Sequence, residues 1–415
     1  MTPTLFAAII LLLLIAKFFG QLWLDHLNQS EIRKNASTVP PAFRDFITEE
    51  NYFKSVQYSF AKIKFGRIEL MFDFVISAII LFSGILPWFF TIGTGVLGTT
   101  SWGSSLLLIV FTVLLFIPGL PFSYYNQFVL EEKFGFNTSN FRTWILDRLK
   151  GLALLLMLGW PILALLLTII AKSGPWWWFW GWCAIIGIQL VMMVLAPIVI
   201  MPLFNKFKPL EEGTLRQRLL QLGEKTGFSA KTIQVMDGSK RSRHSNAFFT
   251  GFGKFRKIVL FDTLISQLDE SELEAVLAHE IGHYKKAHIP KMLAWGAITS
   301  LLGLYLLAWL TNQPWFFHAF GLQTRSIPAA LLLFTLTTEL VTFWFTPLGN
   351  LFSRKFEFEA DAFASDAVGA AIPLIGALRK LNDKNLSNLT PHPRYSAFYY
   401  SHPTLVERER ALKNA

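Results

Sequence analysis

A stretch in the second half of the chain carries two histidines and a glutamate at a spacing that can hold a metal ion. In AVLAHEIGHYKKAH, residues 275–288, His279 and His283 are four residues apart and therefore share one face of a helix. Their imidazole nitrogens can bind one zinc ion, while Glu280 can reach a water on that ion without binding the metal. Catalytic zinc needs a third protein ligand and an open fourth position, and His288 lies on the wrong face of this helix to supply it. The pattern predicts metal-assisted hydrolysis and requires a ligand from elsewhere in the chain.

A cluster of acidic residues further along can supply that ligand. The segment NLFSRKFEFEADAFA, residues 350–364, holds Glu357, Glu359 and Asp361. On a helix Glu357 and Asp361 share a face, whereas Glu359 lies about 200° around the axis from Glu357. One carboxylate can ligate zinc and another can orient a ligating histidine from behind. Spacing alone does not separate Glu357 from Glu359 as the ligand, and an ordinary solvated acidic helix is the alternative.

The composition is that of a membrane protein. Of the 415 residues, 53% are hydrophobic and 16% are charged, and the mean hydropathy is +0.42, whereas soluble domains carry about a quarter charged residues. The net charge of +10 comes from basic residues in particular loops, which favours membrane orientation over nucleic-acid binding. The single cysteine, Cys183, excludes an internal disulfide and a multi-cysteine metal site. The apolar residues 5–19 lack the basic start and cleavage site of a signal peptide, so we expect a retained span.

Long apolar runs predict seven membrane-spanning helices, each near the ~20 residues that cross the hydrocarbon layer. The predicted spans are residues 4–21, 67–93, 102–123, 151–172, 176–203, 290–312 and 327–351. Basic residues concentrate in the loops after the first, third and fifth spans and in the C-terminal tail. By the positive-inside rule, the N-terminus lies outside and the C-terminus lies in the cytoplasm. Both clusters of ionisable residues then lie on the cytoplasmic side, where they can share one site.

The long loop between the fifth and sixth spans has the pattern of a small α/β unit. The segments TIQVMD (residues 232–237) and KIVLFD (residues 257–262) have the β-branched and apolar content of strands, and RSRHSNAFFTGFGKF between them can form another. The sequence then switches to helical spacing, where Asp269 can cap a helix and Glu272 can complete a capping box. His279 therefore lies well inside a helix. We predict a mainly α, multi-pass membrane protein with a small α/β cytoplasmic portion.

Four segments together resemble the integral-membrane CAAX prenyl endopeptidases, the type I zinc enzymes with an HExxH motif. They are SNAFFTG, HEIGH, SRKFEFEADAFA and SHPTLVERERAL, and the seven predicted spans fit the same family. The resemblance implies long helices around a large, water-filled intramembrane chamber, with one Zn²⁺ per chain near its cytoplasmic end. It also implies that Glu357 is the third zinc ligand, beside His279 and His283, and that Asp361 supports a ligand from behind.

The expected mechanism uses further residues. Glu280 takes a proton from the water and passes it to the leaving amine. By the resemblance, His402 and Arg408 bind the substrate carbonyl or the developing oxyanion; without it they fit a surface turn and an ordinary basic helix. Asn246 and Ala247 are similar to the edge-strand motif that binds the substrate backbone in extended form. Without the resemblance, they fit an ordinary strand with an asparagine at a turn.

The expected function is removal of the C-terminal tripeptide from prenylated CAAX proteins or peptides. Partners would be that substrate or another membrane-associated polypeptide, together with the lipid bilayer and without nucleic acid. The same residues would serve a quality-control protease that cuts misfolded or stalled membrane proteins without a prenyl group, and no motif separates the two. A transporter or scaffold with a structural metal is opposed by Glu280, which a closed structural site does not require. The expected location is the bacterial inner membrane or the endoplasmic reticulum membrane, with the site facing the cytoplasm.

We expect four segments along the chain. Residues 1–204 hold the first five spans and their cytoplasmic loops, and residues 205–288 form the loop domain with the edge strand and the HExxH helix. Residues 289–351 hold the last two spans, and residues 352–415 carry the third zinc ligand and the substrate-binding residues.

Overall fold

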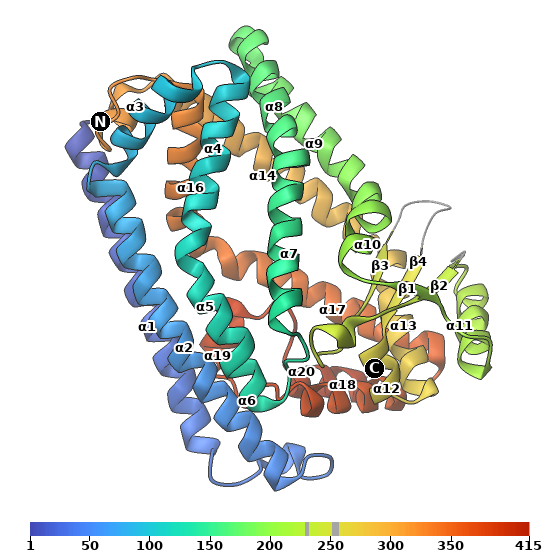
Figure 1. Ribbon diagram of the computed structural model, residues 1–415. Helices are drawn as coiled ribbons and strands as arrows, with labels where there is room; N and C mark the ends of the chain where they lie inside the picture. Colours follow the sequence, from blue (N-terminus) through green and yellow to red (C-terminus); the bar gives the residue numbers. More distant parts are fainter. Residues whose placement is uncertain (229–231, 251–256, 415) are drawn as a thin grey trace.

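The computed structural model describes residues 1–228, 232–250 and 257–414, and it is mainly helical (Figure 1). Within these residues six helices or runs of helices are long and apolar enough to span a membrane: Pro3–Asn35, Ser101–Phe134, Phe141–Lys172, Gly174–Phe204, His288–Thr311 and Ile327–Val368. The bent pair Glu49–Phe82 and Ile85–Leu97 makes a seventh span if it is taken as one. The predicted multi-pass, mainly helical architecture is confirmed.

The spans are built from helices joined by short 3-10 or π-helical turns. In chain order the helices are α1 (Pro3–Asn35), α2 (Glu49–Phe82), α3 (Ile85–Leu97), α4 (Ser101–Phe116), α5 (Leu120–Tyr125), α6 (Glu132–Phe134), α7 (Phe141–Leu154), α8 (Trp160–Lys172), α9 (Trp177–Leu195), α10 (Met201–Phe204), α14 (His288–Thr311), α15 (Pro314–His318), α16 (Ile327–Thr342) and α17 (Thr346–Val368). The joining turns are Ile117–Gly119, Asn126–Glu131, Leu155–Gly159, Gly174–Trp176, Ala196–Ile200 and Phe343–Phe345.

The second predicted span differs from the structure. We expected one helix over residues 67–93, but α2 ends at Phe82 and α3 continues at an angle of 63°. Gly84, between them, adopts the left-handed conformation with φ of +84°, which glycine enters without the steric penalty of a side chain. Hydropathy averages over a window and therefore does not detect a bend within an apolar run.

Several helices also continue beyond the predicted spans. The first predicted span ends at residue 21, whereas α1 runs to Asn35. The seventh ends at residue 351, whereas α17 runs to Val368. Hydropathy finds the apolar part of a helix, and the helix continues here as a polar segment. As a result, α17 leads from a membrane span directly into the acidic cluster.

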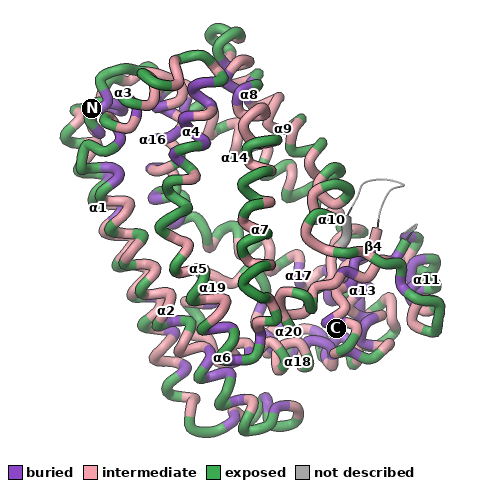
Figure 2. The backbone as a smooth tube through the Cα atoms, viewed as in Figure 1, coloured by how far each residue is buried: buried purple, intermediate pink, exposed green. Residues whose placement is uncertain are grey.

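The long helices are loosely packed along their apolar length. In the most apolar window of each of the six spans, between 0% and 39% of the residues are buried. Figure 2 shows exposed and intermediate residues along most of the middle of these helices. Membrane spans turn many apolar side chains toward lipid, and the low burial of these windows fits that.

The buried residues form two main clusters at opposite ends of α1. One cluster includes Ile10, with Leu86 of α3 and Phe316 of α15. The other includes Ile32, with residues from the C-terminal half of the chain. At 1.5 Å per residue, Ile10 and Ile32 are about 33 Å apart along the helix, which is the thickness of the hydrocarbon layer.

A small α/β portion follows α10. Within the described residues its four-stranded sheet has the order β1-β2-β4-β3, with strands β1 (Phe207–Pro209), β2 (Thr232–Met236), β3 (Ala247–Thr250) and β4 (Lys257–Phe261). Strands β2 and β4 are parallel, and the other two pairs are antiparallel. The two strands predicted before and after the glycine-rich segment are confirmed. The strand predicted between them is present as β3 at the edge of the sheet, and residues 251–255 of that segment lie outside the described residues.

Further helices lie at the same end of the molecule as this sheet (Figure 1). They are α11 (Thr214–Lys225), α12 (Asp262–Gln267), α13 (Glu270–Lys285), α18 (Ile372–Lys384), α19 (Pro393–Tyr399) and α20 (Leu405–Asn414). Leu277 and Ile281 of α13 pack in one buried cluster with Leu374 of α18 and Leu405 of α20. This cluster continues to the end of α1 and the start of α2, so the α/β portion is fixed to the membrane helices.

Candidate active site

Helix α13, which carries the HExxH motif, begins at the predicted capping box. The Asp269 carboxylate accepts a hydrogen bond from the backbone N–H of Glu272 at 3.0 Å, and the Glu272 carboxylate accepts one from the backbone N–H of Asp269 at 2.9 Å. Lys380 Nζ of α18 also donates to Glu272, at 2.6 Å. These bonds fix where α13 begins and hold it against α18.

Helix α13 lies close against α17 at a glycine within the motif. A Cβ atom at Gly282 would lie 3.0 Å from Cα of Ala360 and 3.1 Å from its carbonyl oxygen. Real side chains do not fit comfortably at such distances, so glycine is what allows the two backbones to approach. The close approach brings His279 and His283 of α13 to Glu357 of α17.

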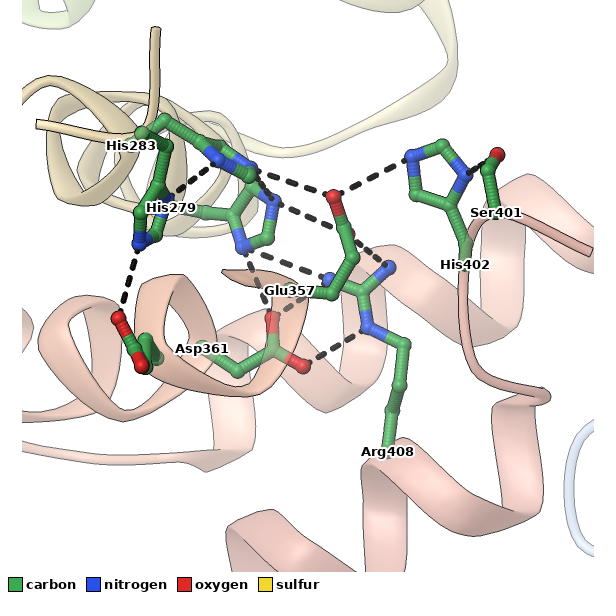
Figure 3. A network of polar contacts seen from close by, with 9 residues as sticks. His279, His283, Glu357, Asp361, Ser401, His402 and Arg408 are labelled. Carbon is green, nitrogen blue, oxygen red and sulfur yellow. Dashed lines mark hydrogen bonds and ion pairs between the residues drawn. The ribbon is translucent and has the colours of Figure 1, made fainter. Parts of the chain in front are cut away.

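The structure brings these three residues, predicted as metal ligands, together (Figure 3). His279 Nε2 lies 3.1 Å from His283 Nε2. Glu357 reaches both rings, with 3.5 Å between its Oε2 and His279 Nε2 and 3.3 Å between its Oε1 and His283 Nε2. One ligand atom from each of the three residues lies within 4.8 Å of the others. Two imidazole nitrogens and one carboxylate oxygen are the ligand set of many catalytic zinc sites.

The carboxylate of Glu357 fits a metal better than it fits the protein alone. Glu357 is buried, and its Oε2 atom has no hydrogen-bond partner among the described residues. A buried charged oxygen without a hydrogen bond is costly. Direct bonding to a cation would satisfy it, and the two facing histidine nitrogens supply the remaining protein ligands.

Glu359 lies on the other side of α17. Its Oε2 atom is 3.0 Å from Nε2 of His288, and it is not part of the group around Glu357. The ambiguity that spacing left between Glu357 and Glu359 is thus resolved by which side of α17 faces α13.

Asp361 and Arg408 lie behind the ligand group. Asp361 Oδ1 is 2.8 Å from Nδ1 of His279, and Arg408 Nε donates to Asp361 Oδ2 at 2.8 Å. Arg408 Nη1 also lies 3.6 Å from Glu357 Oε2. All of these side chains are buried. With Nδ1–H of His279 donated to Asp361, the lone pair on Nε2 faces the other two ligands, as a metal ligand requires.

The pKa of His279 reflects these carboxylates. Burial alone would lower it, but the contacts with the carboxylates of Asp361 and Glu357 outweigh burial and raise the pKa to about 9. A metal ion needs the neutral imidazole, so binding must displace a proton from this group. Proximity to the buried carboxylates makes His279 a strongly basic ligand.

Glu280 lies next to this group on α13. Burial raises the pKa of its carboxyl, while the nearby His279 and His283 act in the opposite direction. A carboxyl with a raised pKa can accept and return a proton near neutral pH. The arrangement suits the predicted role of Glu280 as general base.

His402 approaches from the loop between α19 and α20. Its Nε2 atom is 3.4 Å from Glu357 Oε1, and its Nδ1 is 3.0 Å from Ser401 Oγ. Burial lowers the pKa of His402. A cavity of about 590 Å³ opens beside His402 and Arg408. The tail residues predicted to contact substrate therefore lie both beside the ligands and at the wall of a cavity.

Asn246 and Ala247 lie farther from the ligand group. Ala247 begins β3 and pairs with Leu260 of β4, while the backbone carbonyl of Asn246 accepts from Phe261 N–H at 3.1 Å. Asn246 is exposed, and β3 contacts α13. The structure shows the edge strand beside the HExxH helix, and the substrate-binding role of the two residues stays a prediction.

The contact of one histidine near the site, His288, was not foreseen from the sequence. His288 Nδ1 is 3.0 Å from His283 Nδ1, and the other nitrogen of His288 contacts Glu359. We had placed His288 on the wrong face of a continuous helix. However, α13 ends before Ala287, which has φ of 55°, and this turn brings His288 back against His283. Nothing in the local sequence marks an alanine for the left-handed conformation.

Comparisons with known proteins agree along the whole chain. A family model described as "CAAX prenyl protease N-terminal, five membrane helices" matches residues 28–206, and the model of peptidase family M48 matches residues 209–415. The chain is 38% identical over 399 residues to a CAAX prenyl protease 1 homolog of Arabidopsis thaliana, covering 90% of both chains. It is 35% identical to CAAX prenyl protease 1 of Saccharomyces cerevisiae, covering 96% of this chain and 93% of that protein.

The fold is also similar to a solved structure. The crystal structure of S. mikatae Ste24p superposes with a TM-score of 0.92 at 34% sequence identity, covering 98% of both chains. The M48 family consists of metallopeptidases, and the family model that matches the N-terminal half describes five membrane helices. The chain belongs to peptidase family M48, in its group of multi-pass membrane CAAX prenyl proteases, and is a metalloendopeptidase.

Proposed function

We propose that this protein is a zinc-dependent endopeptidase that removes the C-terminal tripeptide from prenylated CAAX proteins and peptides. The main support is the buried carboxylate of Glu357, which faces His279 and His283 and lacks a hydrogen-bond partner on Oε2 among the described residues. We assign these three residues as the ligands of one zinc ion per chain. Asp361, behind His279, is assigned to hold that ring and its tautomer.

The chemistry follows from this arrangement. A bound zinc would supply a polarised scissile carbonyl and a water with a lowered pKa. Glu280 accepts the proton of that water as its oxygen bonds to the carbonyl carbon. When the C–N bond breaks, Glu280 returns the proton to the leaving nitrogen. His402 and Arg408 are assigned to donate hydrogen bonds to the negative charge that develops on the carbonyl oxygen.

The substrate is proposed to bind as an additional strand beside β3. Among the described strands β3 pairs with β4 alone, so its other edge can offer backbone hydrogen bonds to an extended peptide. Asn246 and Ala247, at the start of β3, would make the first of these contacts. Backbone pairing tolerates many side chains, which suits a protease that accepts different sequences after the prenylated cysteine.

The membrane spans are proposed to present the lipidated substrate. We propose that the helices enclose an interior that takes a peptide and a prenyl chain together, and that the α/β portion closes one end of it. From the positively charged loops and the positive-inside rule, we assign that end to the cytoplasm and the N-terminus to the outside. We propose the endoplasmic reticulum membrane, in line with the eukaryotic relatives, and a bacterial inner membrane is the other location considered. The names of the relatives favour a CAAX substrate over quality control of unmodified membrane proteins.

The proposal is tested with purified protein in detergent and a farnesylated CAAX peptide. We expect release of the C-terminal tripeptide by the wild type and release slowed about 10²–10⁴-fold by Glu280→Gln, with bound zinc in both proteins. The same peptide without the farnesyl group serves as the matched substrate. Cleavage of unmodified membrane proteins without cleavage of the farnesylated peptide would contradict the assigned substrate. A wild-type protein without bound zinc would contradict the assigned ligands.

A further inference from the structure

The second ligand histidine, His283, has a chain of contacts behind it that the proposed mechanism does not use. His283 Nδ1 lies 3.0 Å from Nδ1 of His288, and Nε2 of His288 lies 3.0 Å from Oε2 of Glu359. His288 is 1% exposed. Its ring stacks on Phe356, with 4.2 Å between the ring centroids and 11° between the planes. His288 is therefore held in place on both its edge and its face.

The contacts from His283 through His288 to Glu359 indicate which ring nitrogens carry protons when His283 binds the metal. With Nε2 of His283 bound to the proposed metal, a neutral His283 carries its proton on Nδ1 and donates it toward His288. Nδ1 of His288 then accepts, which places the His288 proton on Nε2. Glu359, a carboxylate with acceptor oxygens only, accepts that proton. Both N–H donors in this series of contacts, one on His283 and one on His288, thus have an acceptor.

The backbone between the two histidines is arranged for this contact. Ala287 has φ of 55° and ψ of 38°, a conformation that is uncommon for residues other than glycine. Its N–H donates to the carbonyl of Tyr284 at 3.0 Å, and its own carbonyl accepts from Lys291 at 3.1 Å. A residue persists in such a conformation when its surroundings determine it. The turn ends α13 and makes His288 the first residue of the membrane helix α14.

We propose that His288, anchored by Glu359 and Phe356, is a positioning residue that fixes the tautomer and ring orientation of His283 for metal binding. The inference rests on the zinc site proposed above. Asp361 contacts His279 directly. Glu359 would support His283 in a comparable way, but the neutral imidazole of His288 lies between them. Partners of this kind typically change metal affinity 10–100-fold when they are removed.

The test measures the zinc dissociation constant of the purified protein by competition with a chelator. His288→Phe keeps an aromatic ring against Phe356 and removes both nitrogens, so we expect zinc affinity to fall about 10–100-fold. His288→Asn places an amide oxygen where His288 carries Nδ1 and can still accept from His283, so we expect a smaller loss. Lys355→Ala, which removes an exposed lysine 3.9 Å from Glu359, is the matched control and should bind zinc as the wild type does.

Two further measurements separate positioning from general stability. The visible spectrum of the cobalt-substituted protein reports ligand geometry, and it should change in His288→Phe and stay the same in Lys355→Ala. After zinc is removed with a chelator, His288→Asn and the wild type should have similar midpoints of thermal unfolding. If His288→Phe does not fold, His288→Asn and Glu359→Gln, with the same readouts, decide the question through intermediate losses of zinc affinity.

Wild-type affinity and an unchanged cobalt spectrum in the folded His288 variants would overturn the inference. So would equal losses in His288→Phe and His288→Asn, because the acceptor on Nδ1 would then not matter. Failure of the wild type itself to bind zinc would instead contradict the proposed function.

Discussion

Helices α13 and α17 bury the side chains where they meet, whereas the apolar spans from α4 to α9 leave many of their side chains exposed. In the first pair Leu277 is 1% exposed and Ile281 and Ala360 are fully buried. In the spans, Met157 is 74% exposed and Val191 is 60% exposed. A metal site needs donor atoms held within a few tenths of an ångström, whereas a chamber for a lipidated peptide needs unfilled space. The contrast is between a tightly packed pair of helices that holds the ligand group and membrane spans whose apolar side chains stay exposed.

The largest effect on activity is expected from Glu280 on α13, one of the two tightly packed helices. Glu280→Gln removes the group that moves the proton but keeps its size, so we expect kcat to fall about 10²–10⁴-fold. Bound zinc should remain at the wild-type level, since Glu280 is not assigned as a ligand. Single-turnover cleavage of the farnesylated peptide, with metal analysis of the same sample, measures both. Near-normal turnover would remove Glu280 from the mechanism.

Truncations in the two regions should separate them in stability. Leu277→Ala leaves a cavity in the α13 core and should lower the free energy of unfolding by about 2–5 kcal/mol. Met157→Ala, at an exposed position of the π-helical turn in the α7–α8 span, should change it by less than about 0.5 kcal/mol. Thermal unfolding in one detergent compares them directly. Equal losses would mean that the spans are packed as tightly as the site.

The Asp361 carboxylate behind His279 is expected to affect zinc affinity more than the free energy of unfolding. Asp361→Asn keeps the shape but replaces the carboxylate that accepts from His279 and Arg408, so zinc affinity should fall about 10–100-fold. The matched variant is Asp366→Asn, further along α17, where no contact with the ligands exists among the described residues. Chelator competition measures both affinities. An Asp361 variant with wild-type affinity would show that the carboxylate only fills space.

The smallest expected difference is in the free energy of unfolding between alanine substitutions at two glycines, one in α13 and one in the membrane span α14. Gly282→Ala places a Cβ against Ala360 of α17 and should destabilise the protein by about 1–3 kcal/mol. Gly296→Ala in α14 meets nothing within 4 Å, so it should be neutral or stabilise the helix by up to about 1 kcal/mol. Thermal unfolding of the two variants, with zinc content as a second readout, checks the difference. The opposite order would contradict the close approach of α13 and α17.

Features that depend on residue type and local spacing were predictable from the sequence. The seven apolar runs, the capping box at Asp269 and the strands on either side of the glycine-rich segment were all recognised. The shared helix face of His279 and His283 also follows from spacing alone. In these cases, the relevant interaction lies within one helix, one strand or one apolar run.

Features that depend on how two helices face each other were not predictable in the same way. Spacing did not separate Glu357 from Glu359, because both lie on one helix and only the position of α13 selects between them. His288 is outside the ligand group, as predicted, but its contact with His283 was not foreseen because the left-handed turn at Ala287 has no local sequence signal. The bend at Gly84 was missed because an apolar run has the same hydropathy whether it is straight or bent.

The most direct test of the central claim is the position of zinc in a crystal of the wild-type protein. Anomalous diffraction on either side of the zinc absorption edge locates the ion independently of any assignment of ligands. The account predicts one peak per chain, bonded to Nε2 of His279, Nε2 of His283 and a carboxylate oxygen of Glu357. A peak bonded to other residues, or no zinc peak in fully active protein, would contradict it.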